Sequence, residues 1–467
     1  NAGYRKVIRD TVEFDPEILG RYVNFLTNPD EETAIEQFGT ADKYFGAATL
    51  LATLPGLPMI GHGQIEGFTE KYGMEFQRAR LDERPDEGLI GHFEAQIVPL
   101  LRDRRRYAGP ADFRLHDVVA EDGALLENVF AYSNGRGDDR SLVVYHNAFG
   151  SAAGWIRDSV PFAVKRANGS KTKRRDTLAA ALGLTGSDDD WLRIRDRRAG
   201  LETLRSIGEV RSRGLHVALD AYGCLVMDEL REVVSTADAP WAALAEQLGD
   251  GWVPSLDDAL ADLRLRPVHE AISQLLDPEA DVATRWVEVT TKVGLSGAPA
   301  PNLGATGPVD RSTRAAVLLG PLGRSRFDEL RLADVLRRLG FDDREIARTR
   351  IAMGLPHPAT VADPAALAER WLADPTVRTF LEVHDWDGVE WLERDRWRDL
   401  LELAAALDAA TGRTGRSPAI GVLRAAAETT GYRLDRLDAE LRAGTSPVVG
   451  GRRSSSRSRD TARRRRR

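Results

Sequence analysis

The pattern that most constrains the fold is an alternation of strand-like and helix-like segments early in the chain. Apolar residues over 22–28 predict a strand, and those over 39–56 recur at helical spacing and stop at a Pro-Gly pair. Residues 57–63 are a second short apolar strand, and apolar positions from 89 to about 107 follow the helical period again. Strand, helix, strand, helix is the unit of a parallel α/β sheet or barrel.

The first strand runs into Asn28, Pro29, Asp30 and Glu31, and this turn has two explanations. In one, Asn28 is the N-cap of a helix, Pro29 takes the first helical position, and Glu31 closes a capping box. In the other, Asp30 is a catalytic carboxylate presented at the end of a strand. The residues themselves leave both explanations open.

The second strand ends in a glycine-rich turn over residues 61–67, GHGQIEG. Its G-x-G-x-x-x-G spacing differs from the dinucleotide-binding G-x-G-x-x-G, and the segment after it is short for the required helix. We therefore favour a tight turn and expect no cofactor. The eight histidines are scattered and no H-E-x-x-H occurs, so we expect no metal site either.

From about Ala111 the apolar period changes to that of strands. Residues 127–148 predict two strands around a polar turn, and residues 214–233 have the same character. Residues 177–205, which lie between these segments, look helical. We therefore expect an antiparallel β domain with a helical insertion, followed by a helical region from about Ala239 to Leu441.

Within this helical region, Trp386, Trp391 and Trp397 raise the question of a sugar-stacking platform. Their gaps of five and six residues do not place them on one helix face, so separate packing roles are favoured. The neighbouring cluster of His384, Asp385 and Asp387 is typical of a loop or a helix entry. No G-x-S-x-G is present, and 72 acidic residues offer no way to choose a catalytic carboxylate pair.

Composition describes an ordinary globular protein, with 42% hydrophobic and 29% charged residues in 467 positions. The single cysteine, Cys224, excludes an internal disulfide and fits a reducing compartment, so we expect a cytoplasmic location. No apolar run approaches the roughly 20 residues needed to span a bilayer. Residues 1–10 lack the apolar core of a signal peptide, and a first residue other than Met suggests a fragment.

Charge is distributed unevenly along the chain. Residues 452–467 hold nine Arg and one Asp, a charge of +8, which leaves −15 for the remainder of a chain of net charge −7. An Arg/Ser-rich end on an acidic body is typical of a disordered tail. Such a tail attracts phosphates nonspecifically, but a solvated tail is favoured and we do not expect a nucleic-acid partner.

Taken as whole segments, residues 21 to about 148 resemble the end of an alpha-amylase family glycoside hydrolase. In that family the seventh barrel strand ends in F-x-x-N-H-D, matched by residues 25–30 with Pro29 in place of the histidine. The eighth strand follows a G-x-P-x-x-Y-Y-G-x-E-like pattern, matched by residues 57–67. Residues 92–115 look like the last barrel helix, and residues 127–148 are similar to the first hairpin of the C-terminal β-sandwich.

The resemblance implies a retaining hydrolase or transglycosylase that acts on an α-glucan or maltooligosaccharide. It gives Asp30 the role of a third carboxylate, which favours the oxocarbenium-like transition state, and gives Asn28 a role in substrate binding. The nucleophile and the general acid, which such a mechanism holds about 5 Å apart, would lie on strands before residue 1. We therefore expect the chain alone to be inactive.

The expected architecture has four parts. These are the last strands and helices of a (β/α)8 TIM barrel over 1–108, an amylase-type β-sandwich over 109–236 with a helical insertion at about 177–205, a helical domain of unassigned role over 237–445, and a disordered tail over 446–467. The alternative to an enzyme part is a non-catalytic polysaccharide-binding or structural module.

Overall fold

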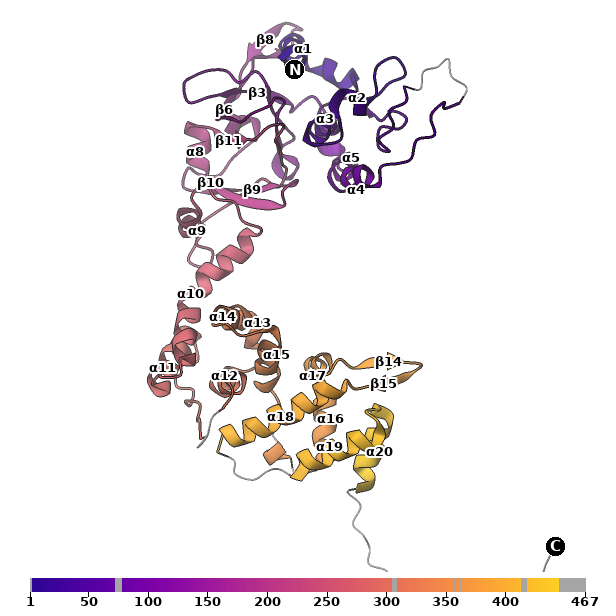
Figure 1. Cartoon of the computed structure of the whole chain (residues 1–467). Coiled ribbons are helices and arrows are strands. Elements are labelled where there is room, and N and C mark those ends of the chain that lie inside the picture. The colour runs from indigo at the N-terminus through magenta and orange to yellow at the C-terminus, as the bar shows by residue number, and fades with distance from the viewer. Residues whose placement is uncertain are drawn as a thin grey trace, which may run out of the picture. The chain divides into compact units, whose positions relative to one another are not determined.

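Strands and helices alternate at the start of the chain as expected. The structure is a computed structural model that describes residues 2–71, 78–304, 309–356, 358–361, 363–412 and 418–444, so the expected tail lies outside the described residues. The chain divides into two units, Asn1–Leu263 and Arg264–Arg467 (Figure 1). The expected domain boundaries at 108/109 and 236/237 both fall inside the first unit. They stay predictions.

The first elements include two strands that pair in parallel, in register from Val23↔Leu57 to Phe25↔Met59. Among the described residues, parallel pairing is confined to these two strands, and no barrel is seen. The expected single helix over 89–107 is wrong, because it is divided into three pieces; the first break falls at Ile97, just before Pro99, whose nitrogen cannot donate a helical hydrogen bond. In chain order these elements are α1 (Ala2–Phe14), η1 (Pro16–Arg21), β1 (Val23–Phe25), α2 (Ala34–Phe38), α3 (Asp42–Thr53), β2 (Leu57–Met59), α4 (Glu87–Gln96), α5 (Val98–Arg102) and α6 (Arg105–Ala108).

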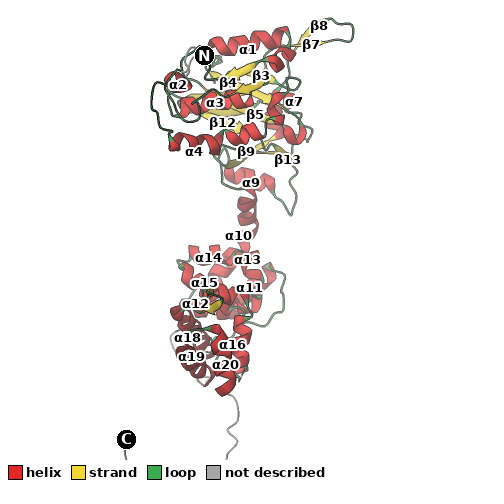
Figure 2. Ribbon diagram, turned by 90° about the vertical axis from the view of Figure 1, so that its right-hand side faces the viewer, coloured by secondary structure: helices red, strands yellow, loops and turns green. Residues whose placement is uncertain are grey.

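A curled antiparallel sheet of nine strands follows, in the order β10-β9-β12-β5-β4-β3-β6-β11 with β13 paired to β9. The strands are β3 (Arg114–Val119), β4 (Val129–Asn134), β5 (Ser141–His146), β6 (Ala152–Ser159), β9 (Trp191–Asp196), β10 (Leu201–Ser206), β11 (Leu215–Leu219), β12 (Cys224–Met227) and β13 (Arg231–Val233). A separate hairpin joins β7 (Phe162–Lys165) to β8 (Lys171–Arg174), and the short helices α7 (Leu178–Ala181) and α8 (Ile207–Ser212) pack beside the sheet. Figure 2 shows the strands among helices α1, α3, α4 and α7.

The structure corrects two expectations for this region. The expected helix over 177–205 is wrong beyond α7, because the second half of this range holds β9 and nearly all of β10, which pair with each other. The expected hairpin over 127–148 is confirmed as β4 and β5. Residues 214–233 do hold two strands, but β11 pairs with β6 whereas β12 pairs with β5 and β9, so they are not partners.

The central strands are buried on both faces, which is why one curled sheet replaces the expected two-sheet sandwich. Phe130 and Tyr132 of β4 join a core with the N-terminal helices, and the alternate residues Val129 and Ala131 join a core with α7 and α8. Successive side chains point to opposite faces of a strand. Helices therefore cover both faces, and no second sheet is needed to bury either one.

Helix α3 approaches β5 unusually closely. A Cβ added at Gly46 would lie 2.0 Å from the ring of Tyr145, so a side chain there has no room. The Tyr145 hydroxyl also donates to the backbone oxygen of Lys43 at 3.3 Å, and Thr53 is hydrogen-bonded to the Tyr132 hydroxyl. These contacts fix α3, and with it the parallel strands, on the antiparallel sheet.

The second unit is mainly helical, as expected, and is built around two apolar cores. Helix α9 (Trp241–Leu248) belongs to the first unit, and α10 (Leu256–Leu276) begins in the first unit and ends in the second. The others are α11 (Val282–Lys292), α12 (Arg311–Leu319), η3 (Gly320–Leu322), α13 (Arg326–Glu329), α14 (Leu332–Arg338), α15 (Asp343–Ala352), η4 (Pro358–Thr360), α16 (Pro364–Leu372), α17 (Pro375–Phe380), α18 (Arg394–Ala410), α19 (Pro418–Thr430) and α20 (Leu434–Gly444). No helix of the described residues is long and apolar enough to cross a membrane.

One hairpin interrupts these helices, formed by β14 (His384–Trp386) and β15 (Val389–Trp391). His384 and Asp385 lie on a strand and Asp387 in the hairpin turn, so the expected loop or helix entry is a β-hairpin. Trp397, by contrast, is buried and packs edge-on against Trp371 at 6.3 Å, which confirms a packing role for that residue.

We predict that Gly46→Ala destabilises the first unit. The added methyl group overpacks the contact with Tyr145, at a cost of about 1–3 kcal/mol, which exceeds the gain of about 1 kcal/mol in helix propensity. Gly91→Ala is the matched control, because Gly91 lies on the exposed side of α4 with nothing within 4 Å of the added atom. Hydrogen exchange of the β4 and β5 amides should accelerate in the first variant only; equal rates would contradict the packing argument.

Acid is expected to weaken the first unit through His116 of β3. Burial lowers the pKa of this histidine to about 4, and its Nε2 lies 2.9 Å from the Ser133 hydroxyl. The neutral ring is therefore favoured in the folded chain, and stability should fall as the pH drops from about 6.5 to 4, by at most about 1.4 kcal/mol per pH unit.

NMR titration of the imidazole should place the His116 transition near pH 4, and His116→Gln should flatten the pH dependence of unfolding between pH 6.5 and 4. The matched control is His216→Gln, which makes the same substitution at an exposed position of β11. A His116 transition near its ordinary pKa would show that burial does not control this group.

Candidate functional site

The loops after β1 and β2 meet at one edge of the parallel pair. Because the strands are parallel, their C-terminal ends lie side by side, and the loops that follow them leave from the same end of the pair. A Cβ added at Gly61 would lie 2.6 Å from the backbone oxygen of Thr27, so glycine is required where the loops touch. We call this edge the rim, meaning residues 27–34 and 60–68.

Asn28 shapes the first rim loop. Its Oδ1 accepts hydrogen bonds from the backbone N–H groups of Asp30 at 3.0 Å and Glu31 at 2.7 Å. These are the bonds of an N-cap, but no helix starts here; α2 begins later, capped by Thr33. The expectation that a helix starts at Asn28 is therefore wrong, although the Asn28 side chain does organise the turn. Asp30 is exposed on this turn.

Gln64 is the central residue of the second rim loop. It is 1% exposed, its Oε1 accepts from the Gly61 N–H at 3.3 Å, and its backbone oxygen accepts from the Tyr44 hydroxyl at 2.7 Å. Its Nε2 is buried and has no hydrogen-bond partner among the described residues. A buried amide in this state is uncommon. Sequence reasoning missed Gln64, and its position between two turn glycines was the one available signal.

The surroundings of Gln64 are equally fixed. Burial, aided by the charge of Glu66, raises the pKa of Tyr44 on α3, so its hydroxyl stays protonated and donates. Gly63 has a φ of +72°, and a Cβ there would lie 2.6 Å from Phe68. The helix that a dinucleotide loop would need does not directly follow, because residues 68–71 are not helical, and the next helix of the described residues is α4 from Glu87.

A longer loop beside the rim is held by two carboxylates. Glu83 accepts from the N–H and hydroxyl of Thr69, both at 2.7 Å, and from the Glu70 N–H at 3.0 Å. Glu70 in turn accepts from the Arg80 N–H at 2.8 Å. Burial alone would raise the pKa of Glu83, but the hydrogen bonds from Thr69 and Glu70 outweigh it and lower that pKa. Residues 72–77, between these anchors, lie outside the description.

The face of the parallel pair that points away from the helices is apolar and open. Val23 is 47% exposed and its partner Leu57 is 62% exposed, and Phe25 is 39% exposed beside them. In the described structure β1 and β2 pair only with each other, so each also has a free outer edge. Parallel sheets are ordinarily covered on both faces.

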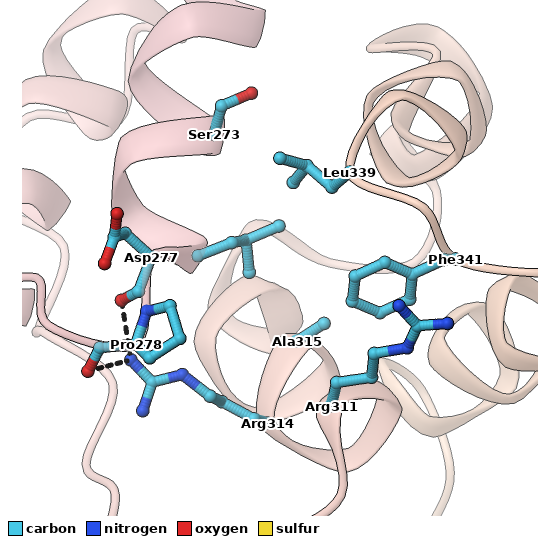
Figure 3. A pocket seen from close by; sticks show the side chains of 9 residues that line it. Ser273, Asp277, Pro278, Arg311, Arg314, Ala315, Leu339 and Phe341 are labelled. Carbon is cyan, nitrogen blue, oxygen red and sulfur yellow. Dashed lines mark hydrogen bonds between the residues drawn. The ribbon is translucent and has the colours of Figure 1, made fainter.

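Of the predicted site residues, the rim brings together Asn28 and Asp30. Within the described ranges, no group of three His, Cys, Asp or Glu side chains is arranged to hold a metal ion. A cavity of about 290 Å³ in the second unit lies between α10, α12 and residues 339–341. Figure 3 shows that Arg314 there is bonded to the backbone oxygens of Asp277 and Pro278, and that Arg311 lies beside Phe341. These arginines serve the fold, and we assign this cavity no chemistry.

Comparison with known proteins gave no matching family model and no matching curated protein. Among solved structures, the chain is distantly similar to an Anoxybacillus alpha-amylase described as representing a new glycosyl hydrolase subclass. The identity is 13% and the TM-score 0.27, over 45% of this chain and 38% of that one. Ttha1563 from Thermus thermophilus matches with 18% identity and a TM-score of 0.27, over 44% and 35% of the two chains. The chain thus spans little more than a third of the length of either protein.

Proposed function

We propose that the first unit is the C-terminal part of a retaining, alpha-amylase-type glycoside hydrolase or transglycosylase that acts on α-glucans or maltooligosaccharides. One observation carries the proposal. The N-P-D turn directly follows β1, the G-H-G-Q turn directly follows β2, and parallel pairing sets both on one rim. In α/β barrels, catalytic residues stand on the loops at the C-terminal ends of the strands.

The open face of the parallel pair supports the same proposal. A two-stranded sheet is marginally stable by itself, and exposed apolar side chains such as Val23 and Leu57 normally mark a contact surface. In the proposed enzyme, further strands of a (β/α)8 barrel pair with the outer edges of β1 and β2 and cover this face. The same strands would provide the polar partner that Gln64 lacks.

Asp30 acts in this proposal as a supporting carboxylate. An exposed, fixed negative charge on the rim stabilises the positive charge that develops on the sugar ring in an oxocarbenium-like transition state. The two bonds accepted by the Asn28 oxygen hold Asp30 in place. Asn28 can therefore contact a sugar hydroxyl only through its amide nitrogen. Pro29 supplies no imidazole, so the sugar contact that the family makes there is absent.

A second function, a polysaccharide-binding module without chemistry, is favoured by one observation in the second unit. Trp386 is 73% exposed at the end of the β14–β15 hairpin. A flat, exposed indole offers a surface on which a sugar ring can stack.

The first prediction is that the purified chain does not hydrolyse starch or maltoheptaose. A retaining mechanism needs a nucleophile and a general acid about 5 Å apart, and the resemblance places neither on β1 or β2. Reducing-sugar release over many hours should equal that of a buffer blank. Robust turnover that survives repurification would contradict the assignment of the nucleophile and acid to other strands.

The second prediction concerns the reading frame that encodes the chain. Sequencing upstream of the Asn1 codon should reveal an in-frame coding region that predicts further barrel strands, with an Asp and a Glu at the ends of two of them. In the polypeptide that includes them, Asp30→Asn should lower kcat at least about 100-fold, because a transition-state interaction is lost. The control is Glu31→Gln, which removes the adjacent exposed charge and should leave kcat within about twofold of the parent value. An in-frame start codon with no such strands would contradict the proposed function.

A further inference from the structure

The β14–β15 hairpin has a tightly determined conformation. Its register pairs His384 with Trp391 and Trp386 with Val389, leaving a two-residue turn of Asp387 and Gly388. Both turn residues have positive φ, +55° and +74°, as the favoured type I′ hairpin turn requires. The Gly388 N–H also donates to Asp385 Oδ1 at 3.1 Å. In Figure 1 the hairpin extends from the helices of the second unit.

The base of the hairpin is anchored to the helices around it. Trp391 forms a β-bridge with Arg433, whose guanidinium lies 5.5 Å from the centre of the indole ring. The Leu392 N–H donates to the backbone oxygen of Tyr432 at 2.9 Å. Glu390 forms an ion pair with Arg378 of α17. The strands therefore present their side chains on a fixed support.

Strand pairing gathers aromatic rings on one face of this support. Residues directly opposite each other in an antiparallel pair share a face, and alternate residues along a strand do the same. His384, Trp386, Val389 and Trp391 consequently lie on one side, and Asp385 and Glu390 on the other. Trp391 is half-buried at the base, whereas the Trp386 indole at the tip is 73% exposed. The face is a strip of two indoles and an imidazole.

The polar groups beside the strip indicate which class of ligand it fits. Residues 384–391 include three carboxylates, Asp385, Asp387 and Glu390, and no Lys or Arg. Glu390 is ion-paired with Arg378, and Asp385 lies on the opposite face and accepts from the Gly388 N–H, so Asp387 is the carboxylate that stands beside Trp386 at the tip. Carboxylates complement hydrogen-bond donors, and a flat indole face complements an apolar surface. A pyranose ring has both, with C–H groups on its faces and hydroxyl donors around its edge.

We propose that the β14–β15 hairpin is a polysaccharide-binding site, in which Trp386 stacks on a sugar ring and Asp387 accepts a hydrogen bond from a sugar hydroxyl. The choice of an α-glucan as the ligand rests on the proposed function of the first unit; the stacking site itself does not. On a glucan-active enzyme this site tethers a polymer to the chain that carries the catalytic unit and so raises the effective concentration of substrate.

Native electrophoresis of the full chain through gels that contain glycogen, amylopectin or a mixed-linkage β-glucan tests the proposal. The parent chain should be retarded by the two α-glucans. Trp386→Ala should raise the apparent Kd at least tenfold, and Trp386→Phe should restore part of the affinity. Asp387→Asn should weaken binding a fewfold without disturbing the turn, because Asn also tolerates positive φ.

The matched control is Phe149→Ala, which removes another exposed aromatic ring, 86% exposed, from the first unit. It should leave retardation unchanged, and circular dichroism should confirm that every variant is folded. Absence of retardation of the parent, or equal retardation of Trp386→Ala, overturns the site.

Two further outcomes distinguish other ligands. If only the β-glucan retards the parent chain and Trp386→Ala abolishes that retardation, the α-glucan assignment is overturned. The proposed function of the first unit is then still tested separately by the upstream sequencing. A parent dimer that Trp386→Ala converts to a monomer in sedimentation velocity, with unchanged glucan retardation, shows that a second copy covers the indole and overturns the proposal.

Discussion

The contact between Gly46 and the ring of Tyr145 is the constraint on which the first unit depends. At this point the α3 backbone lies against the Tyr145 ring of the antiparallel sheet, closer than a side chain at position 46 would allow. The same helix carries Tyr44, whose hydroxyl holds the backbone of Gln64. Helix α3 thus links the antiparallel sheet to the rim. The position of Asp30 therefore depends on packing against Tyr145, which lies far from it in the sequence.

Much of the early fold follows from periodicity. The segments at 22–28, 39–56 and 57–63 became β1, α3 and β2, because apolar spacing and turn residues agreed there. The expected two-sheet sandwich is wrong because β4 and β5 carry the near-continuous apolar runs VFAY and LVVY. Near-continuous apolar runs indicate strands buried on both faces, and both cores use them.

Other features depended on pairing, which single-segment reasoning does not reveal. Residues 191–206 mix charged and apolar side chains without a strict alternation, and their hydrogen bonding to each other makes them β9 and β10 rather than a helix. Trp386 and Trp391 are five residues apart, which argues against a shared helix face. Around an Asp-Gly turn the same spacing puts them on one face of a hairpin. The location of Asp30 on a strand-end turn was predicted from the resemblance, whereas the buried amide of Gln64 has no periodic signature.

The open face formed by Val23, Phe25 and Leu57 also bears on how such a chain is made. Polypeptides leave the ribosome N-terminus first, and domains fold as units in that order. In the proposed barrel, the strands that cover this face are synthesised earlier, so β1 and β2 emerge onto an assembled template. The apolar face is then a docking face during synthesis, and it promotes aggregation only when the chain is produced without the strands proposed to cover it.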